Sequence, residues 1–190
     1  MATVIYFHGF ASTGTGPKVD ALKSAFPNDV VLAPDLPSDP VDVILTINSI
    51  IDKVKNYPLI FVGTSLGGFW ANYFGQVYDV PAVLVNPSTR PSQTLAQRVN
   101  TEVVNYHTGD IIKITAKDID RFKSLESTIE SLYNGALVHL FVAEDDNVIN
   151  PAVTLENIKY TKFKSVTPDG GHRYSEKWND VISHMQAILK

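Results

Sequence analysis

A serine between two glycines stands where an apolar segment meets a helix-like segment. Residues 63–67 read Gly-Thr-Ser-Leu-Gly, directly after the apolar run 59–62 and at the start of a helical pattern over 66–78. This strand–turn–helix context is typical of a nucleophile elbow, in which glycines leave room for a tight turn that exposes the serine hydroxyl. The pattern therefore predicts nucleophilic catalysis by Ser65.

His172 is the histidine best placed to act as the base for this serine. It follows Gly170 and Gly171 on a loop between the last predicted strand and the terminal helix, where the backbone can present its ring to the elbow. Structural roles are expected for the other histidines, which are His8, His107, His139 and His184.

The third group of a catalytic triad is expected on the loop after the penultimate strand, because α/β-hydrolases order the triad as Ser, Asp, His along the chain. Residues 144–146 read Glu-Asp-Asp after the predicted strand 137–142. Asp146 has the expected spacing, whereas Asp145 requires a turn one residue tighter. Glu144 projects too early, and Asp169 lies too close to His172 in the sequence.

Two backbone amides are candidates for an oxyanion hole. The Leu66 amide opens the helix after the nucleophile, and the Phe10 amide lies on the loop after the first strand, 4–7. His8, beside Gly9 at the end of that strand, is expected to order the loop. Trp70 and Val148 are candidate walls of a substrate pocket, although Trp70 fits a place in the core equally well.

The elements that must position these residues alternate along the chain. Continuous apolar strands separated by helical patterns indicate a parallel sheet covered on both faces. We therefore expect an α/β-hydrolase fold with about six strands, in a single domain over residues 1–190, with 88–117 as a cap-like insertion. The predicted strands are 4–7, 30–33, 59–62, 82–85, 137–142 and about 163–166, and the predicted helices are 18–26, 41–54, 66–78, 119–133, one after Pro151 and one from about Tyr174.

Composition narrows the classes of partner. The chain of 190 residues is 44% hydrophobic, which suits one compact domain, and its net charge of −4 disfavours a nucleic-acid surface. No cysteine is present, so a disulfide or a thiolate metal site is excluded. We expect no cofactor, no metal, no membrane span and a cytoplasmic location. The sequence does not predict the oligomeric state.

Taken together, these motifs resemble those of the YqiA-like esterases, and the resemblance covers nearly the whole chain. The chain departs from the family in having Asp145 where a glycine is more usual. The resemblance implies a compact α/β-hydrolase with little cap that hydrolyses carboxylesters or acyl-thioesters. It rests on residues 6–10 (YFHGF), 34–37 (PDLP), 63–69 (GTSLGGF), 85–87 (VNP), 90–91 (RP), 106–109 (YHTG), 146–148 (DNV) and 170–172 (GGH).

These residues together predict a serine hydrolase acting on a small-molecule acyl ester or thioester. Ser65 is expected to form an acyl-enzyme, with His172 and Asp146 completing the triad. One alternative is a catalytically silent protein that uses the same pocket only to hold a ligand. Acyl transfer, perhydrolysis or peptide cleavage on the same fold are further alternatives, because a fold alone does not fix the chemistry.

Overall fold

The computed structural model describes residues 1–105 and 107–189, so Tyr106, which belongs to one of the family-like segments, lies outside the described residues. Six strands form a parallel sheet in the order β2-β1-β3-β4-β7-β8, and β5 and β6 form a separate antiparallel pair. The strands of the large sheet are β1 (Thr3–Phe7), β2 (Val30–Leu32), β3 (Leu59–Thr64), β4 (Ala82–Val85), β7 (Val138–Ala143) and β8 (Phe163–Thr167).

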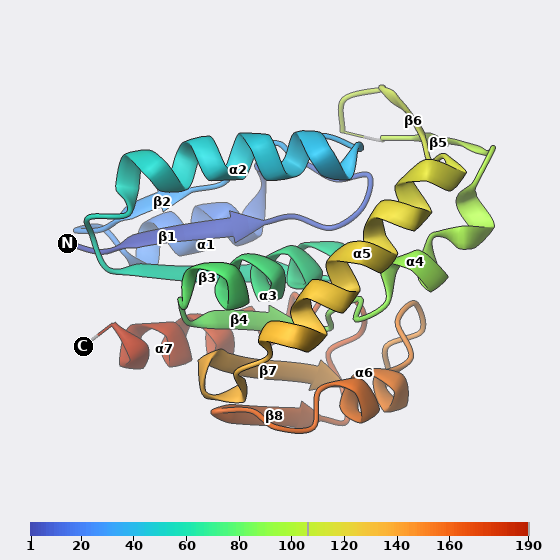
Figure 1. Cartoon of the computed structure of the whole chain (residues 1–190). Coiled ribbons are helices and arrows are strands. Elements are labelled where there is room, and N and C mark those ends of the chain that lie inside the picture. The colour runs from blue at the N-terminus through green and yellow to red at the C-terminus, as the bar shows by residue number, and fades with distance from the viewer. Residues whose placement is uncertain (106, 190) are drawn as a thin grey trace.

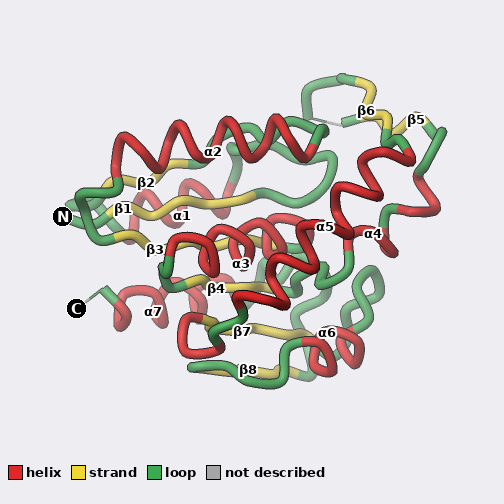
Figure 2. The backbone as a smooth tube through the Cα atoms, viewed as in Figure 1, coloured by secondary structure: helices red, strands yellow, loops and turns green. Residues whose placement is uncertain are grey.

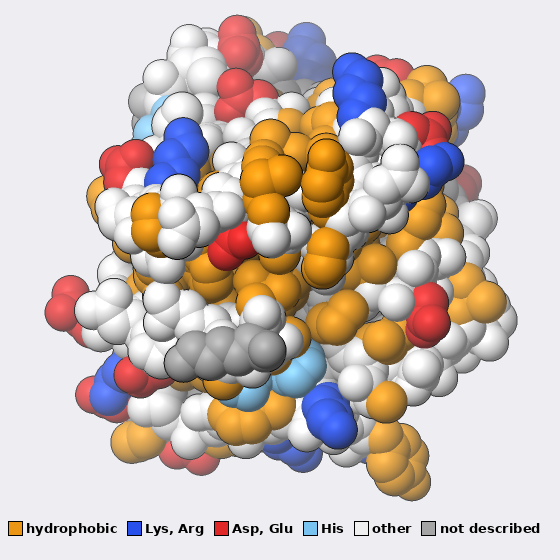
Figure 3. Space-filling model, turned by 90° about the vertical axis from the view of Figure 1, so that its left-hand side faces the viewer, with side chains coloured by type: hydrophobic (Ala, Val, Ile, Leu, Met, Phe, Trp, Pro, Cys, Tyr) orange, Lys and Arg blue, Asp and Glu red, His pale blue; other side chains and the backbone are white. Residues whose placement is uncertain are grey.

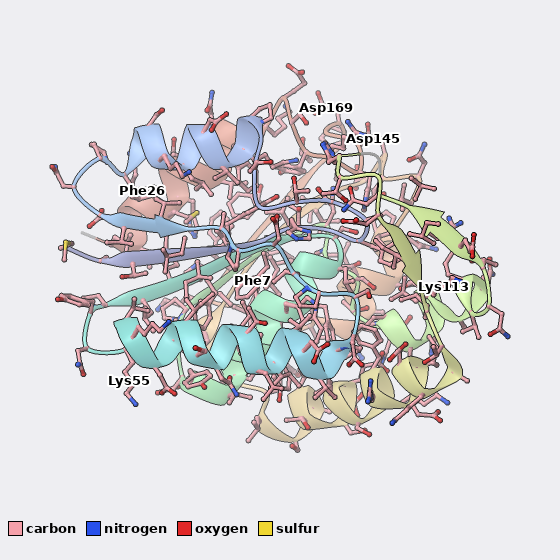
Figure 4. The ribbon with its side chains drawn as sticks, turned by 90° about the horizontal axis from the view of Figure 1, so that it is seen from above. Phe7, Phe26, Lys55, Lys113, Asp145 and Asp169 are labelled. Carbon is pink, nitrogen blue, oxygen red and sulfur yellow. The ribbon has the colours of Figure 1, made fainter. Side chains whose placement is uncertain are left out.

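Helices cover both faces of this sheet, as the apolar strands require. Strands β1, β4 and β7 are buried along their whole length, whereas the edge strands β2 and β8 are only partly buried. One face carries α1 and α7, and the other carries α2, α3 and α5 (Figures 1 and 4). The α-helices are α1 (Pro17–Ala25), α2 (Pro40–Val54), α3 (Leu66–Tyr78), α4 (Pro91–Thr94), α5 (Ala116–Leu132), α6 (Pro151–Asn157) and α7 (Trp178–Ile188).

Helices α1 and α2 begin within one residue of the predicted starts, but α5 and α7 begin three or four residues away from them. Helix α5 begins at Ala116 rather than near 119, because Thr115 and Asp118 form a reciprocal capping box at its start. Helix α7 begins at Trp178 rather than near 174, because the backbone of Tyr174 has a φ of 55°, which a right-handed helix does not allow.

The insertion 88–117 contains a hairpin that the sequence pattern does not reveal. Besides α4 and the short 3₁₀ helix η1 (Ala96–Arg98), it contains β5 (Glu102–Val104) and β6 (Ile111–Lys113), which lie at the upper right of Figure 1. The Asn105 side chain donates a hydrogen bond of 3.0 Å to the Ser12 carbonyl oxygen. The hairpin is thus tied to the loop that follows β1.

All six strands of the large sheet point the same way, so their carboxyl ends meet at one edge, on the right of Figure 1. The loops that follow the strands gather there (Figure 2). Figure 3 shows the opposite face, at the amino ends of the strands, where hydrophobic side chains gather near the centre. Within residues 1–105 and 107–189, no helix is long and apolar enough to cross a membrane.

Candidate active site

Ser65 stands at a strained turn between β3 and α3. Its backbone has φ 56° and ψ −123°, a region that residues other than glycine rarely adopt. A Cβ on Gly63 would lie 2.0 Å from the Gly67 carbonyl oxygen, and a Cβ on Gly67 would lie 2.0 Å from the Phe7 carbonyl oxygen. Only glycine fits at either position, which explains the spacing of the elbow.

His172 and Asp146 are hydrogen-bonded to each other at the same edge of the sheet. The distances from His172 Nδ1 to Asp146 Oδ2 and Oδ1 are 2.8 and 3.0 Å. Asp146 Oδ1 also accepts hydrogen bonds from the backbone amides of Val148 (2.8 Å) and Ile149 (2.9 Å). The Asp146 side chain is only 1% exposed.

The electrostatics of this pair favour the ionised carboxylate. Burial alone raises the pKa of Asp146, but the hydrogen bonds from His172, Ile149 and Val148 outweigh it and hold the pKa below its ordinary value. A carboxylate can only accept, so Nδ1 of His172 is the donor. The other ring nitrogen, Nε2, is then left as the basic atom of the neutral ring.

Ser65 and His172 line adjoining hollows, and among the described residues no hydrogen bond joins their side chains. Ser65, Val148 and Ile149 line a cavity of about 440 Å³. His172 lines the neighbouring hollow, and Val148 is common to both. Catalytic hydrogen bonds are often long before substrate binds, so this arrangement is compatible with proton transfer between the two side chains.

Two side chains anchor the loop that carries His172. Asp145 Oδ1 accepts a hydrogen bond of 2.8 Å from the Gly171 amide. Asn86 Nδ2 donates to the carbonyl oxygens of Gly171 (2.9 Å) and His172 (3.2 Å), while Asn86 Oδ1 accepts from the Ala143 amide (2.8 Å). Asn86 therefore joins the ends of β4 and β7 to the histidine loop.

The sequence analysis includes Asn86 in the family-like segment 85–87 but assigns it no role in the site. The signal that could have identified it is its place at the carboxyl end of β4, beside the strand that leads to Asp146. The Asn86 side chain is 2% exposed, and its φ of 43° is one that asparagine tolerates better than most residues.

The remaining acidic candidates make other contacts. Glu144 is exposed, and Asp169 accepts from the Thr167 hydroxyl at 2.9 Å and lies 3.1 Å from the Lys177 ammonium. The hydrogen bond from Lys177 lowers the pKa of Asp169. Figure 4 labels Asp145 and Asp169, both on loops near the carboxyl ends of the strands. Of the four candidate acids, Asp146 is the one hydrogen-bonded to the His172 ring.

The two residues expected to supply oxyanion amides lie beside the serine. Phe10 and Leu66 line the same cavity as Ser65. Leu66 is the first residue of α3, and an amide in the first turn of a helix has no partner within the helix. The loop after β1 passes close to the serine, since a Cβ on Gly9 would lie 3.4 Å from Ser65 Cβ.

His8 holds that loop in place with both ring nitrogens. Nδ1 hydrogen-bonds to the Gly9 carbonyl oxygen, and Nε2 accepts from the Leu36 amide, each at 2.8 Å. Burial lowers the pKa of His8, which favours the neutral ring that this pair of bonds requires. His8 therefore joins the loop after β1 to the loop after β2.

The two candidate wall residues lie in different hollows. Val148, 63% exposed, lines the cavity that contains Ser65. Trp70, 1% exposed, lines a second cavity of about 270 Å³, which also includes Phe10 and Leu66. Within the described residues, no group of three or more histidine, aspartate or glutamate side chains could hold a metal ion.

Comparison with protein families gives a match over nearly the whole chain. The model of a family described as "Uncharacterised protein family (UPF0227)" matches residues 3–190, and this is the YqiA-like family that the sequence resembles. A UPF0227 protein of Vibrio parahaemolyticus is 22% identical, with 97% of this chain and 96% of the relative covered. A UPF0227 protein of Pectobacterium carotovorum is 27% identical, with 87% and 93% covered.

Solved structures with the same fold are α/β-hydrolases. A putative hydrolase from Agrobacterium vitis has a TM-score of 0.77 and 15% identity, with 100% of this chain and 88% of that chain covered. Est1E from Butyrivibrio proteoclasticus, with bound ferulic acid, has a TM-score of 0.73 and 13% identity, with 100% and 88% covered. A monoacylglycerol lipase from Paleococcus ferrophilus has a TM-score of 0.68 and 15% identity, with 96% and 93% covered. The chain has the α/β-hydrolase fold.

Proposed function

We propose that this chain, which belongs to the UPF0227 family, is a serine hydrolase that cleaves acyl esters or acyl-thioesters. The observation that carries the proposal is the arrangement at the carboxyl edge of the sheet. A serine in a strained elbow and a histidine whose Nδ1 is 2.8 Å from a buried aspartate line adjoining hollows that share Val148. Each member of a Ser-His-Asp triad is thus available in the chain order of this fold.

In the proposed reaction, His172 Nε2 takes the proton of the Ser65 hydroxyl as Oγ attacks the acyl carbon. The negative oxygen of the tetrahedral intermediate is stabilised by the amides of Leu66 and Phe10. The bond to the leaving group then breaks, and His172 returns the proton to the departing oxygen or sulfur. Asp146 holds the ring in the required tautomer and stabilises its charged form.

The acyl-enzyme is resolved by water in a second half-reaction. His172 removes a proton from the water as the water oxygen attacks the acyl carbon. His172 then returns a proton to Ser65 Oγ as the bond between the acyl carbon and Oγ breaks. The products are the free acid and the alcohol or thiol. The similar structures include an enzyme with bound ferulic acid and a monoacylglycerol lipase, which supports ester chemistry over peptide cleavage for this chain.

A fluorophosphonate probe and a nitrophenyl ester of a short acid test the proposal together. The wild-type protein should be labelled at Ser65 and release nitrophenol, whereas Ser65→Ala should do neither while keeping its thermal unfolding temperature. Absence of both labelling and turnover in the wild type would favour the silent binding protein. Turnover in Ser65→Ala near the wild-type rate would exclude Ser65 as the nucleophile.

A further inference from the structure

A second cavity opens from the proposed oxyanion hole and runs beneath the β5–β6 hairpin. Its volume is about 270 Å³, and it shares Phe10, Leu66 and Leu95 with the cavity that contains Ser65. Its other apolar walls come from the loops after β1 and β2, from α3, from the insertion and from α5. They include Leu36, Trp70, Ile112, Ile114 and Phe122.

The position of His172 decides which half of the substrate this cavity can hold. In the proposed reaction His172 returns a proton to the leaving group, so the leaving group must lie next to the His172 ring. The serine cavity extends to that side, because Val148 lines both it and the hollow that contains His172. Neither His172 nor the loop that carries Asp146 lines the cavity beneath the hairpin.

We propose that this second cavity is the acyl subsite, and that it takes uncharged acyl groups of medium length. This inference rests on the proposed function and names the substrate class for the same site. The volume falls just below the usual range of small-molecule pockets, about 300–1,000 Å³, which suits a medium acyl chain rather than a long lipid tail. Asp35 and Asp110 also line the cavity, and two carboxylates disfavour an acyl group that ends in a negative charge.

The hairpin supplies the residue that best tests the subsite. Val103 of β5 pairs with Ile112 of β6, and both are half-buried, whereas Val104 is 44% exposed and does not line the cavity. Asn105 fixes the hairpin to the loop after β1 through the Ser12 carbonyl oxygen, so the wall stays in place. Ile112→Trp should therefore fill the subsite, and Val104→Trp, at an exposed position outside the cavity lining, adds the same side chain to the hairpin as a matched control.

The experiment compares nitrophenyl esters from acetyl to decanoyl on the wild type and on both variants. Burial of each methylene should raise kcat/KM of the wild type about fourfold, or roughly 250-fold over the four methylenes from acetyl to hexanoyl, until the cavity is full. Ile112→Trp should abolish this rise, while Val104→Trp should keep the wild-type profile. The wild type should also prefer a hexanoyl ester to an adipoyl half-ester of the same length.

A second substrate series holds the acyl group as acetyl and lengthens the alcohol. If Ile112→Trp removes chain-length selectivity in this series instead, the cavity holds the leaving group and the proposal is wrong. Equal slowing of all acyl esters by Ile112→Trp, or a wild-type rate independent of acyl length, would also overturn it. If Ile112→Trp does not fold, Ile112→Ala decides the question, because a larger cavity should move the optimum to longer chains.

The two proposals fail in different ways. Failure of the proposed function leaves no ester hydrolysed and Ser65 unlabelled by the phosphonate. Failure of the acyl subsite leaves Ser65 labelled and the acetyl ester hydrolysed, with the wrong dependence on chain length.

Discussion

Replacement of Asp146 by asparagine should lower kcat by as much as ~10⁴-fold, because it changes the tautomer of His172. Asp146 Oδ1 accepts from two backbone amides, Val148 and Ile149, whereas among the described residues Oδ2 accepts from the histidine alone. An asparagine keeps its oxygen toward the two amides and therefore places its NH₂ group against His172 Nδ1. Nδ1 must then accept, so the proton moves to Nε2, which can no longer take the serine proton.

Asp145→Asn is the matched control for this change. Asp145 accepts from the Gly171 amide, and the carbonyl oxygen of an asparagine can accept the same bond. The loss is the difference between a charge-assisted and a neutral hydrogen bond, about 1 kcal/mol. We therefore expect Asp145→Asn to cost at most about fivefold in kcat/KM.

Steady-state kinetics with a short acyl ester measure kcat and KM for both variants, and phosphonate titration gives the fraction of active protein. Thermal unfolding checks that each variant is folded. A larger loss for Asp145→Asn than for Asp146→Asn would refute the reasoning and move the acid one residue toward the N-terminus.

Three further predictions concern other parts of the molecule. Burial, with His184 and Lys162 nearby, lowers the pKa of His139 to about 4 from 6.5, so the folded state holds it neutral. On the order of 3 kcal/mol of stability should then be lost as the pH falls from 6.5 to 4, and urea unfolding should show a weaker pH dependence for His139→Gln. Asn86→Asp places a carboxylate against two carbonyl oxygens and should lower kcat on the order of tenfold or more while KM stays similar, as Michaelis–Menten analysis at a fixed pH would show. Hydrolysis should continue in EDTA, and a loss restored by a divalent cation would contradict the metal-free mechanism.

The strands were predictable because a strand that is buried on both faces has a continuous run of apolar residues. The run 82–85 is predicted and observed as β4, and 59–62 lies within β3 (Leu59–Thr64). Strand order was not predictable, since it depends on pairings such as β4 with β7 that join segments far apart in the chain. The hairpin was missed because each of its strands has three residues with exposed ends, which gives no apolar period.

Within the site too, features that depend on local contacts could be predicted from the sequence, and a role that depends on distant contacts could not. The elbow is a local feature, because the requirement for Gly63 and Gly67 arises from the turn itself and from the end of β1. The spacing after β7 favoured Asp146, which is found hydrogen-bonded to His172. The role of Asn86 in holding the histidine loop could not be predicted, because it depends on contacts with Ala143 and His172, which are 57 and 86 positions further along the chain.

These contacts of Asn86 have a consequence for the order in which the site is assembled during folding. Closing chain segments of this length has an entropic cost, so contacts between distant residues form slowly compared with a local turn. The serine elbow is formed by β3 and α3 against the end of β1, all in the N-terminal half of the chain, whereas positioning of His172 requires β4, β7 and the loop before α7 to be in place. Under the proposed mechanism, a nascent or partly folded chain therefore carries Ser65 without its base, and Ser65 becomes an active nucleophile only once the C-terminal third of the molecule has docked.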